Sequence, residues 1–572
     1  LVKNSATKDD PATIERFAGL LPRYKLNVYA LQYHAEQNGT WREPSERYQQ
    51  VIETVGALAG RDGVLEPALF VCPFFRPRID LTKQADVELY TDRLRWGVRQ
   101  GYQWIEVDFN DWAQWQHVTA AEKARFADIG QYWAHLTNSV YEAIRPEFPD
   151  VGIIVCATSP WYRGQARPEL VTLCRAIPED VLTYWTGPVT RSRRISAGQV
   201  EDWTRATGRK PLLWDNTIYA HFQPYWVGYA FNPFFNTFPP NLPELLAGPG
   251  MHLNATAAPH YVPGIMTYAD YLWNPEGYDP GRSIRTALRL CWGEEAPDAA
   301  QEVQERLVGL YRMLYECGKG WEPYDRAHAD AMLSELQEAV TRLADIAGDP
   351  ALAADMDERF VSAARAAVEQ FKPPEKLAPR PEPIARPLSA GAVNPSVEEV
   401  VDGKPVGWSL YHGAGVARMS LSPDANSGER SLCIEATRWY QDPTHPTHGD
   451  RKWINVALVH GSELGGKEGR DAYDVEPSTS YRCSFYLKGD VPTVHLQYQG
   501  WSFMMDSNAR ESLRGDLEEI RPTGEWQRYT STFDTDYATK KFALKFALIG
   551  YEDEGMRLGS IWVDDVSIEA LE

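Results

Sequence analysis

Short apolar runs that alternate with amphipathic segments over the first 215 residues constrain the fold most strongly. The runs are rich in Val, Ile, Leu and aromatic residues, as expected for strands that are buried on both faces. They cover residues 26–31, 68–73, 104–109, 152–156, 181–185 and 211–215. Segments with apolar residues at helical spacing lie at residues 10–24, 43–60, 84–100, 120–145, 168–176 and 196–207. This order predicts a parallel sheet covered by helices.

A (β/α)8 barrel accounts for this alternation better than an open, doubly wound sheet. Six or more strand–helix units fit into about 280 residues, as a barrel requires. No Gly-rich turn of the dinucleotide-binding type follows any of the predicted strands. We therefore predict an α/β fold with a barrel over residues 1–282.

The remaining 290 residues divide into regions with different patterns. Residues 283–371 combine amphipathic spacing with many Ala, Leu, Glu and Arg residues, which predicts a helical bundle. Residues 372–388 are rich in proline and form a stiff linker. Residues 389–572 change to short runs with a period of two, which predicts an antiparallel β-sandwich of the jelly-roll type.

Charge and aromatic content favour some partners over others. The net charge of -21 argues against nucleic acid or an anionic membrane surface as a partner, because phosphate groups would be repelled. No apolar run is long enough to span a membrane. The chain has 20 Trp, 29 Tyr and 19 Phe, and flat rings stack well on sugars, although large cores also use them. We expect a glycan partner, and the oligomeric state stays open.

The cysteines and the first residue bear on the cellular compartment. The seven cysteines have no metal-ligand spacing, and Cys433 and Cys483 in the last region are either paired or free. The chain begins at Leu1 without Met, which is consistent with a removed signal peptide. We expect a secreted or cell-surface protein, with the cytoplasm as the alternative.

The third predicted strand ends in the densest group of acids. Glu106, Asp108 and Asp111 lie within six residues together with Asn110, and such a group is costly to bury unless the strand opens into a polar cleft. Active sites of barrels lie at the carboxyl ends of their strands. This stretch therefore predicts an acid/base site, and a solvated strand-to-loop junction is the alternative. Polar and aromatic residues also end other strands: Gln32, Trp161, Trp185, Thr186, Trp214, Asp215 and Asn216.

Several motifs in the barrel region resemble one family of sugar hydrolases. They are Trp-Thr-Gly-Pro at 185–188, Trp-Asp-Asn at 214–216, and Asp-Tyr-Leu-Trp-Asn-Pro at 270–275 with Tyr-Asp-Pro at 278–280, preceded by residues 26–29 and 41–44. In this order they resemble glycoside hydrolase family 84, the O-GlcNAcases and bacterial hyaluronidase-like β-N-acetylglucosaminidases. The resemblance covers roughly residues 12–290.

The resemblance implies retaining cleavage of a terminal N-acetylhexosamine by substrate-assisted catalysis, with no cofactor. The acetamido oxygen of the sugar attacks the anomeric carbon and forms an oxazoline. One aspartate orients the acetamide, and the next is general acid and then base. The second aspartate falls on Asp111, and the first falls on Asn110. An amide accepts the same hydrogen bond but supplies no charge, and it does not raise the pKa of Asp111 as a carboxylate would.

Further site residues follow from the resemblance and from its departures. Six residues stand at family positions for binding the sugar: Trp185, Thr186, Trp214, Asn216, Asn254 and Asn274. Gln32 stands where the family has Lys, His221 replaces a carboxylate or is a surface histidine, and Trp161 or Tyr162 replaces a displaced Tyr. A Gly-Phe-Tyr-Gly-like turn is replaced by residues 4–9. Asp108 and Glu106 share strand parity with Asn110, so Asp108 is either a compensating carboxylate or structural.

The last region resembles the jelly-roll carbohydrate-binding modules of polysaccharide hydrolases. The resemblance rests on residues 394–398, 407–408 and 562–566. It implies a structural calcium ion held by Glu398 and Asp565. Tyr498 and Trp501 are the candidate stacking residues, and a sandwich that merely packs on the barrel is the alternative.

The leading hypothesis is a retaining exo-β-N-acetylhexosaminidase that acts on glycoconjugates or polysaccharides, with Asp111 and Asn110 as its catalytic residues. Two alternatives remain open. One is a related hydrolase of a different sugar, suggested by the changes at Gln32 and His221. The other is a non-catalytic glycan-binding protein that keeps the barrel, suggested by Asn110.

Overall fold

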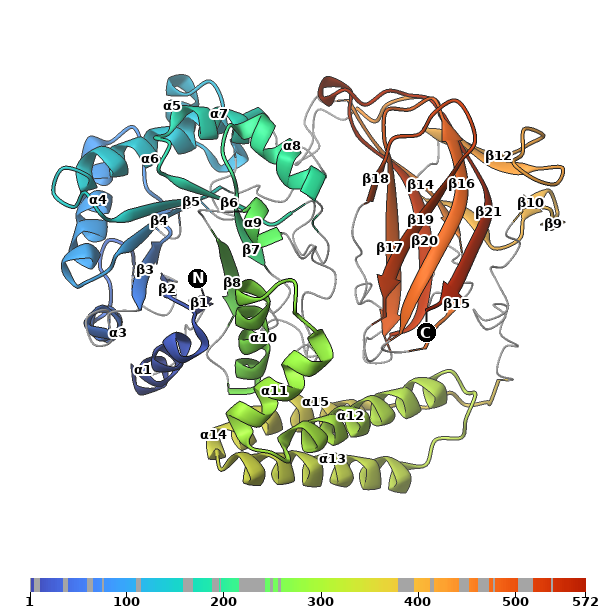
Figure 1. Cartoon of the computed structure of the whole chain (residues 1–572), viewed down its shortest axis with the longest axis horizontal. Coiled ribbons are helices and arrows are strands. Elements are labelled where there is room, and N and C mark those ends of the chain that lie inside the picture. Colours follow the sequence, from blue (N-terminus) through green and yellow to red (C-terminus); the bar gives the residue numbers. More distant parts are fainter. Residues whose placement is uncertain are drawn as a thin grey trace. The chain divides into compact units, whose positions relative to one another are not determined.

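The structure is a computed structural model of the chain (Figure 1). It describes residues 2–4, 11–33, 40–58, 65–74, 77–109, 115–157, 168–187, 195, 197–215, 242–246, 250–255, 259–378, 396–411, 416–441, 452–460, 473–476, 479–502, 518–535 and 539–571.

Eight parallel strands close into a barrel in the N-terminal part of the chain (Figure 1). They are β1 (Val2–Asn4), β2 (Val28–Tyr33), β3 (Glu66–Val71), β4 (Trp104–Asp108), β5 (Gly152–Cys156), β6 (Leu182–Trp185), β7 (Leu212–Asp215) and β8 (Met251–Ala255). β1 pairs with both β2 and β8, which closes the ring. The predicted (β/α)8 barrel is confirmed. β1 and β8 lie outside the six predicted runs, because β1 is three residues long and β8 carries His252 and Asn254 among its apolar residues.

Helices cover the outer surface of the barrel (Figure 1). They are α1 (Pro11–Leu20), η1 (Leu21–Tyr24), α3 (Glu46–Leu58), α4 (Gln84–Arg99), η3 (Trp115–His117), α5 (Ala120–Arg125), α6 (Ile129–Ile144), α7 (Pro168–Ala176), α8 (Ala197–Thr207), α9 (Leu242–Leu245), η5 (Pro259–Tyr261) and α10 (Val262–Trp273). The single helix expected over 120–145 is divided into α5 and α6. Phe126 takes an extended conformation, and Asp128 starts α6 by accepting a hydrogen bond from the Gln131 N–H.

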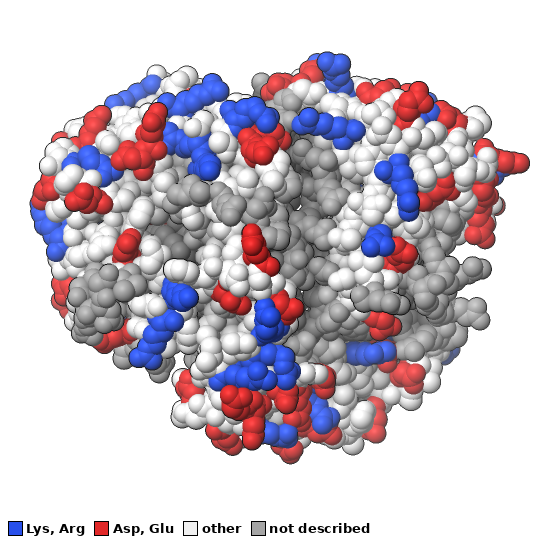
Figure 2. All heavy atoms as spheres, viewed as in Figure 1, with Lys and Arg blue, Asp and Glu red and all other residues white. Residues whose placement is uncertain are grey.

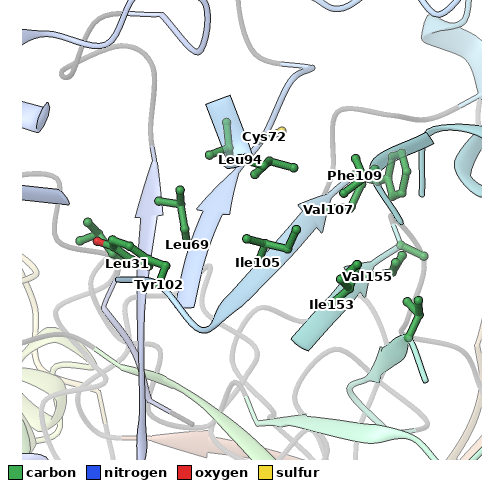
Figure 3. Packing of buried hydrophobic residues seen from close by; sticks show 14 of the residues in the cluster. Leu31, Leu69, Cys72, Leu94, Tyr102, Ile105, Val107, Phe109, Ile153 and Val155 are labelled. Carbon is green, nitrogen blue, oxygen red and sulfur yellow. The ribbon is translucent and has the colours of Figure 1, made fainter. Parts of the chain in front are cut away.

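The strands alternate between two apolar layers, as a strand period of two requires. One layer lies between strands and helices, where Ile105 and Val107 of β4 pack with Ile153 and Val155 of β5 (Figure 3). The other layer fills the barrel interior. Its buried apolar members are Val28, Ala30, Ala68, Phe70, Ile154, Cys156, Tyr184, Leu212 and Trp214. Neighbouring residues of a strand therefore have different surroundings.

Helices follow the barrel as expected, and the chain as a whole divides into two compact units. The helices are α11 (Pro280–Trp292), α12 (Ala296–Gly318), α13 (Arg326–Ala347), α14 (Pro350–Met356), the π-helical η6 (Asp357–Val361) and α15 (Ser362–Gln370). The first unit contains Leu1–Ala300 and Arg342–Met356, and the second contains Gln301–Thr341 and Asp357–Glu572. The boundary between the units thus lies within the helical region.

Two antiparallel sheets form the predicted β-sandwich in the last region, which is thereby confirmed. One sheet has the order β11 (Trp408–Tyr411), β14 (Trp453–His460), β20 (Thr539–Tyr551), β17 (Val494–Ser502) and β18 (Glu518–Ile520), and β15 (Tyr473–Asp474) pairs with β20. The other has the order β12 (Ala417–Ser422), β13 (Ser431–Ala436), β21 (Ser560–Ala570), β16 (Ser480–Gly489) and β19 (Gln527–Asp534). A short pair, β9 (Val400–Val401) and β10 (Lys404–Pro405), and the turn η8 (Glu552–Glu554) complete it.

The structure also bears on three other features of the protein, namely membrane-spanning helices, cysteine pairing and the distribution of surface charge. None of the described helices has the length and apolar character needed to cross a membrane. The seven cysteines are free thiols, so Cys433 and Cys483 are not bonded to each other. On the face shown in Figure 2, Lys and Arg side chains are interspersed among Asp and Glu side chains.

Candidate active site

The interior of the barrel contains a buried group of two acids and a thiol. Glu106 and Asp108 of β4 are inward-facing and at most 1% exposed, and Cys156 of β5 lies beside them. One carboxylate oxygen from each acid and the Cys156 Sγ all lie within 4.8 Å of one another. Asp108 is paired with Cys156, and the Phe109 N–H continues the ladder by donating to the Cys156 carbonyl at 2.9 Å. The strand register therefore brings these groups together.

Aromatic side chains from β3, β6, β7 and β8 complete the interior beside these acids. The Tyr184 hydroxyl lies 2.6 Å from Nδ1 of His252, within hydrogen-bond distance. The His252 ring stacks on Trp214, with centroids 4.8 Å apart and an interplanar angle of 8°. Phe70 contacts the His252 ring edge-on at 5.8 Å. These rings pack against one another beside the acids of β4.

The buried acids influence the tyrosines around them. Burial first, and then the charge of Glu106, raise the pKa of the Tyr184 phenol well above its usual range. Burial also raises the pKa of Tyr90 in α4, with further contributions from Cys72, Asp108 and Glu106. Both phenols therefore stay protonated at any physiological pH.

Besides Trp185, the structure places four of the predicted site residues in buried positions at or near the strand ends. Asp108 is 1%, Thr186 2%, Trp214 3% and Asn254 5% exposed. Asp108 and Trp214 line the interior, and Asn254 shares the strand parity of His252. For Gln32 the backbone lies in β2 opposite Phe70, and its side chain is outside the described residues. Other predicted residues lie outside the described residues altogether: Asn110, Asp111, Trp161, Tyr162, Asn216 and His221.

Trp185 does not line the barrel interior. Its ring belongs to the layer between strands and helices and stacks on Trp203 of α8, with centroids 5.1 Å apart. Because Tyr184 faces inward, the next residue must face outward. Asp215 at the end of β7 shows the same alternation, since its charge, after burial, raises the pKa of Tyr268 in α10. The prediction that Trp185 binds the sugar is therefore wrong.

Asn274 lies at the amino end of the barrel strands, opposite their carboxyl ends. It follows α10, and its Oδ1 accepts a hydrogen bond from the Gly277 N–H at 3.2 Å. The neighbouring Trp273 donates from Nε1 to the carbonyl of Lys25, which precedes β2. A helix that follows a parallel strand returns to the amino end of the sheet, where residues serve stability. Asn274 therefore closes a turn, and its predicted sugar-binding role is wrong.

A buried carboxylate anchors the chain after β4, and the sequence analysis did not identify it. Glu122 caps α5 in a capping box with Thr119 and forms a 2.8 Å ion pair with Arg78. It also accepts hydrogen bonds from the Leu81 N–H and the Tyr132 hydroxyl, both at 3.1 Å. Burial would raise the pKa of Glu122, but its hydrogen bonds to Arg78 and to backbone N–H groups hold it below the usual value. The Thr-x-x-Glu spacing was the signal that identifies this cap.

Tyr498, a predicted stacking residue of the sandwich, is part of its core. The side chain is 3% exposed, its ring stacks on Phe533 with centroids 4.8 Å apart, and its hydroxyl donates to Ser531. Since β17 is covered on this face by the other sheet, the ring cannot meet a glycan, and the prediction is wrong. The side chain of Trp501 is outside the described residues.

The two predicted calcium ligands hold a loop of the sandwich. Glu398 accepts hydrogen bonds from the N–H groups of Glu429 and Arg430, and Asp565 accepts from the side chains of Asn426 and Ser427. Burial raises the pKa of the adjacent Asp564 to about 6. N–H and O–H donors thus occupy carboxylate oxygens that a calcium ion would need. This donor set does not fit the predicted calcium site.

Residues 22–305 match the family model described as β-N-acetylglucosaminidase. The barrel belongs to this family, glycoside hydrolase family 84. This match confirms the resemblance inferred from the motifs, and it supports a glycoside hydrolase of the β-N-acetylglucosaminidase type for the barrel.

One solved structure supports the barrel fold, and a second is given with it for comparison only. A mutant of the Thermobaculum terrenum O-GlcNAc hydrolase has a TM-score of 0.51 at 16% identity, over 63% of this chain and 79% of that chain. A structure described as CpGH84B has a TM-score of 0.47 at 15% identity, over 65% of this chain and 68% of that chain. None of the curated proteins compared with the chain matches it significantly.

Proposed function

We propose that the barrel is a retaining, exo-acting β-N-acetylhexosaminidase that uses the acetamido group of its substrate as the nucleophile. The observation that carries the proposal is the family match over residues 22–305. It is supported by the end of β4 at Asp108, because Asn110 and Asp111 follow directly on the carboxyl end of that strand.

In the proposed reaction the acetamido oxygen attacks the anomeric carbon while the bond to the leaving oxygen breaks. Asp111 gives its proton to the leaving oxygen, and Asn110 accepts a hydrogen bond from the acetamide N–H and so orients the carbonyl. Water then opens the oxazoline at the anomeric carbon, and Asp111 takes the proton of that water. The acetamide is restored, and the configuration of the sugar is retained.

We propose that residues at or after the carboxyl ends of the barrel strands make the remaining contacts with the sugar. Asn254 supplies a buried amide for a sugar hydroxyl, and Trp214 forms part of the wall behind the site. We assign hydroxyl contacts also to Gln32, Asn216 and His221, and stacking to Trp161 or Tyr162. Thr186 contributes a buried hydroxyl that has no partner among the described residues.

The test is hydrolysis of aryl β-N-acetylglucosaminides and β-N-acetylgalactosaminides by wild type and by Asp111→Asn. We expect the substitution to lower kcat about 10²- to 10⁴-fold, the usual loss of a general acid. Asp92→Asn, at an exposed carboxylate of α4, is the matched control and should leave kcat unchanged. Fluorine substitution in the acetamido methyl group should slow the wild type progressively, because it weakens the nucleophile.

The alternatives predict different outcomes of these assays. Hydrolysis of aryl glycosides of another sugar, with none of either N-acetylhexosaminide, would favour a rebuilt sugar pocket. Retained glycan binding without turnover of any aryl glycoside would favour a non-catalytic protein.

A further inference from the structure

Three rings inside the barrel form a compact group, which we call the barrel floor. Tyr184 of β6, Trp214 of β7 and His252 of β8 have ring centroids 4.8 Å apart in each of their three pairs. The Tyr184 hydroxyl lies 2.6 Å from Nδ1 of His252, within hydrogen-bond distance. Since β7 lies between β6 and β8 in the sheet, the barrel floor connects three neighbouring strands.

Packing alone does not require polar atoms in the barrel floor. Tyr184 is 1% and His252 0% exposed. A Phe and a Leu at these two positions would fill the layer without the cost of burying a hydroxyl and an imidazole. A buried hydrogen bond, unlike an apolar contact, specifies both the direction and the separation of the groups that make it. The Tyr184–His252 pair therefore fixes the position of β6 relative to β8.

Two of the proposed sugar contacts lie next to the barrel floor, nearer to the carboxyl ends of the same strands. Asn254 lies in β8 two residues after His252, so strand parity directs both side chains to the interior. Thr186 follows directly on β6, two residues after Tyr184. Two residues advance a strand by about 7 Å, so Thr186 and Asn254 form the next layer. They are 2% and 5% exposed, and the Thr186 hydroxyl has no partner among the described residues.

We propose that Tyr184 and His252 are positioning residues for the sugar site, an inference that rests on the proposed function. Their hydrogen bond holds β6 and β8 at one separation across β7. The His252 ring also holds the Trp214 ring by stacking on it at an interplanar angle of 8°. The Thr186 hydroxyl and the Asn254 amide are thereby kept at one spacing before the sugar binds, which lowers the entropy cost of binding. Neither positioning residue touches the sugar.

The test is a double-mutant cycle between Tyr184→Phe and Asn254→Ala, measured as kcat/KM of the full-length protein for an aryl β-N-acetylglucosaminide. Tyr184→Phe removes one oxygen atom and keeps the ring, and we expect kcat/KM to fall about 5- to 50-fold. Asn254→Ala alone should lower kcat/KM about 10- to 100-fold. In the Tyr184→Phe background it should cost less than about fivefold, because the amide is already displaced.

A matched control separates this positioning role from a merely structural one. Tyr90 of α4 is 0% exposed, and its hydroxyl donates to the Val71 carbonyl at 2.8 Å, so Tyr90→Phe also removes a buried hydrogen bond. Tyr90→Phe should lower the melting temperature but leave kcat/KM, and the loss caused by Asn254→Ala, at their wild-type size. His252→Phe should reproduce the loss caused by Tyr184→Phe. Combining these two substitutions should add little, because both remove the same hydrogen bond.

Equal losses from Asn254→Ala in the wild-type and Tyr184→Phe backgrounds would overturn the positioning role and leave the proposed function intact. The same non-additivity with Tyr90→Phe would also overturn it. If Tyr184→Phe does not fold, as judged by circular dichroism, His252→Phe takes its place in the cycle.

A wild type that hydrolyses no aryl N-acetylhexosaminide would overturn the proposed function. The same cycle is then measured as Kd for N-acetylglucosamine. Non-additive changes of Kd would still support the positioning role, whereas additive changes, or no binding to the wild type, would overturn it as well.

Discussion

At the scale of single residues, strand parity separates side chains that line the interior from neighbours that support it. Tyr184 hydrogen-bonds to His252 inside the barrel, while Trp185 stacks on Trp203 in the helix layer. Adjacent residues of a sequence motif therefore need not all face the same site. Asn254 and Asn274 make the same point at larger separation, because one lies in a strand and the other in a turn at the opposite end of the barrel.

The two asparagines allow a matched prediction. Asn254→Ala should lower kcat/KM about 10- to 100-fold, since a buried amide that binds a sugar hydroxyl is lost. Asn274→Ala should leave kcat/KM unchanged and cost about 1 kcal/mol of stability, because it removes a turn hydrogen bond. Steady-state kinetics and thermal unfolding of both variants measure this. Equal kinetic losses in the two variants would contradict the assignment.

At the scale of elements, β4 carries two buried acids, and the helix α5 that comes after it begins with a capping box that holds the chain in place. β4 presents Glu106 and Asp108 inward, and the capping box of α5 begins at Thr119. Glu122 connects this point to Arg78 and Leu81, which follow β3. A local capping signal thus anchors the downstream end of the segment that contains Asp111.

Substitution of Glu122 should destabilise the barrel in a pH-dependent way. Glu122→Gln should cost about 2 to 3 kcal/mol at pH 7.5, because the Arg78 guanidinium and buried N–H donors lose their carboxylate. The folded pKa of Glu122 is lowered, so its contribution is present above the unfolded pKa and is lost as the pH falls through the folded value. The difference between variant and wild type should therefore shrink below about pH 4.

Urea unfolding at pH 7.5 and at acidic pH measures this difference, with Glu88→Gln on α4 as the control because it changes an exposed carboxylate. A stability difference that stayed constant with pH would show that the ionised form of Glu122 is not the stabilising one.

At the scale of the whole molecule, the compact unit that contains the barrel also includes helical residues beyond those matched by its family. The first compact unit includes Arg342–Met356 although the family match ends at residue 305. Within this unit α14 packs on η5, and the buried His260 ring hydrogen-bonds to Asp355. The compact unit that contains the barrel therefore includes residues that lie far from the barrel in the sequence.

Truncation tests this dependence. A chain that ends at Ala300 should melt at a lower temperature than one that ends at Gln370, because His260 loses Asp355 and η5 loses the helix that covers it. Circular dichroism melting curves of the two chains compare them directly. Identical melting temperatures would show that residues 342–356 are not part of the stabilising unit. Asp355→Ala in the longer chain should reproduce part of the loss.

Features that depend on local pattern could be predicted from the sequence alone. Apolar runs and helical spacing identified six of the eight barrel strands, and the change to a period of two identified the sandwich. The motifs identified the family, and the acids that end β4 marked the carboxyl end of the strand. These features are local because hydrogen bonding and side-chain direction repeat over a few residues.

Which side chains contact one another depends on the three-dimensional arrangement of the elements. Tyr184 and His252 are 68 residues apart, and strand pairing alone brings their rings together. Trp185, Asn274 and Tyr498 have the right chemistry for sugar binding, but strand parity, helix direction and the second sheet of the sandwich place them elsewhere. Register and chain direction are properties of paired elements, so no single stretch of sequence contains them.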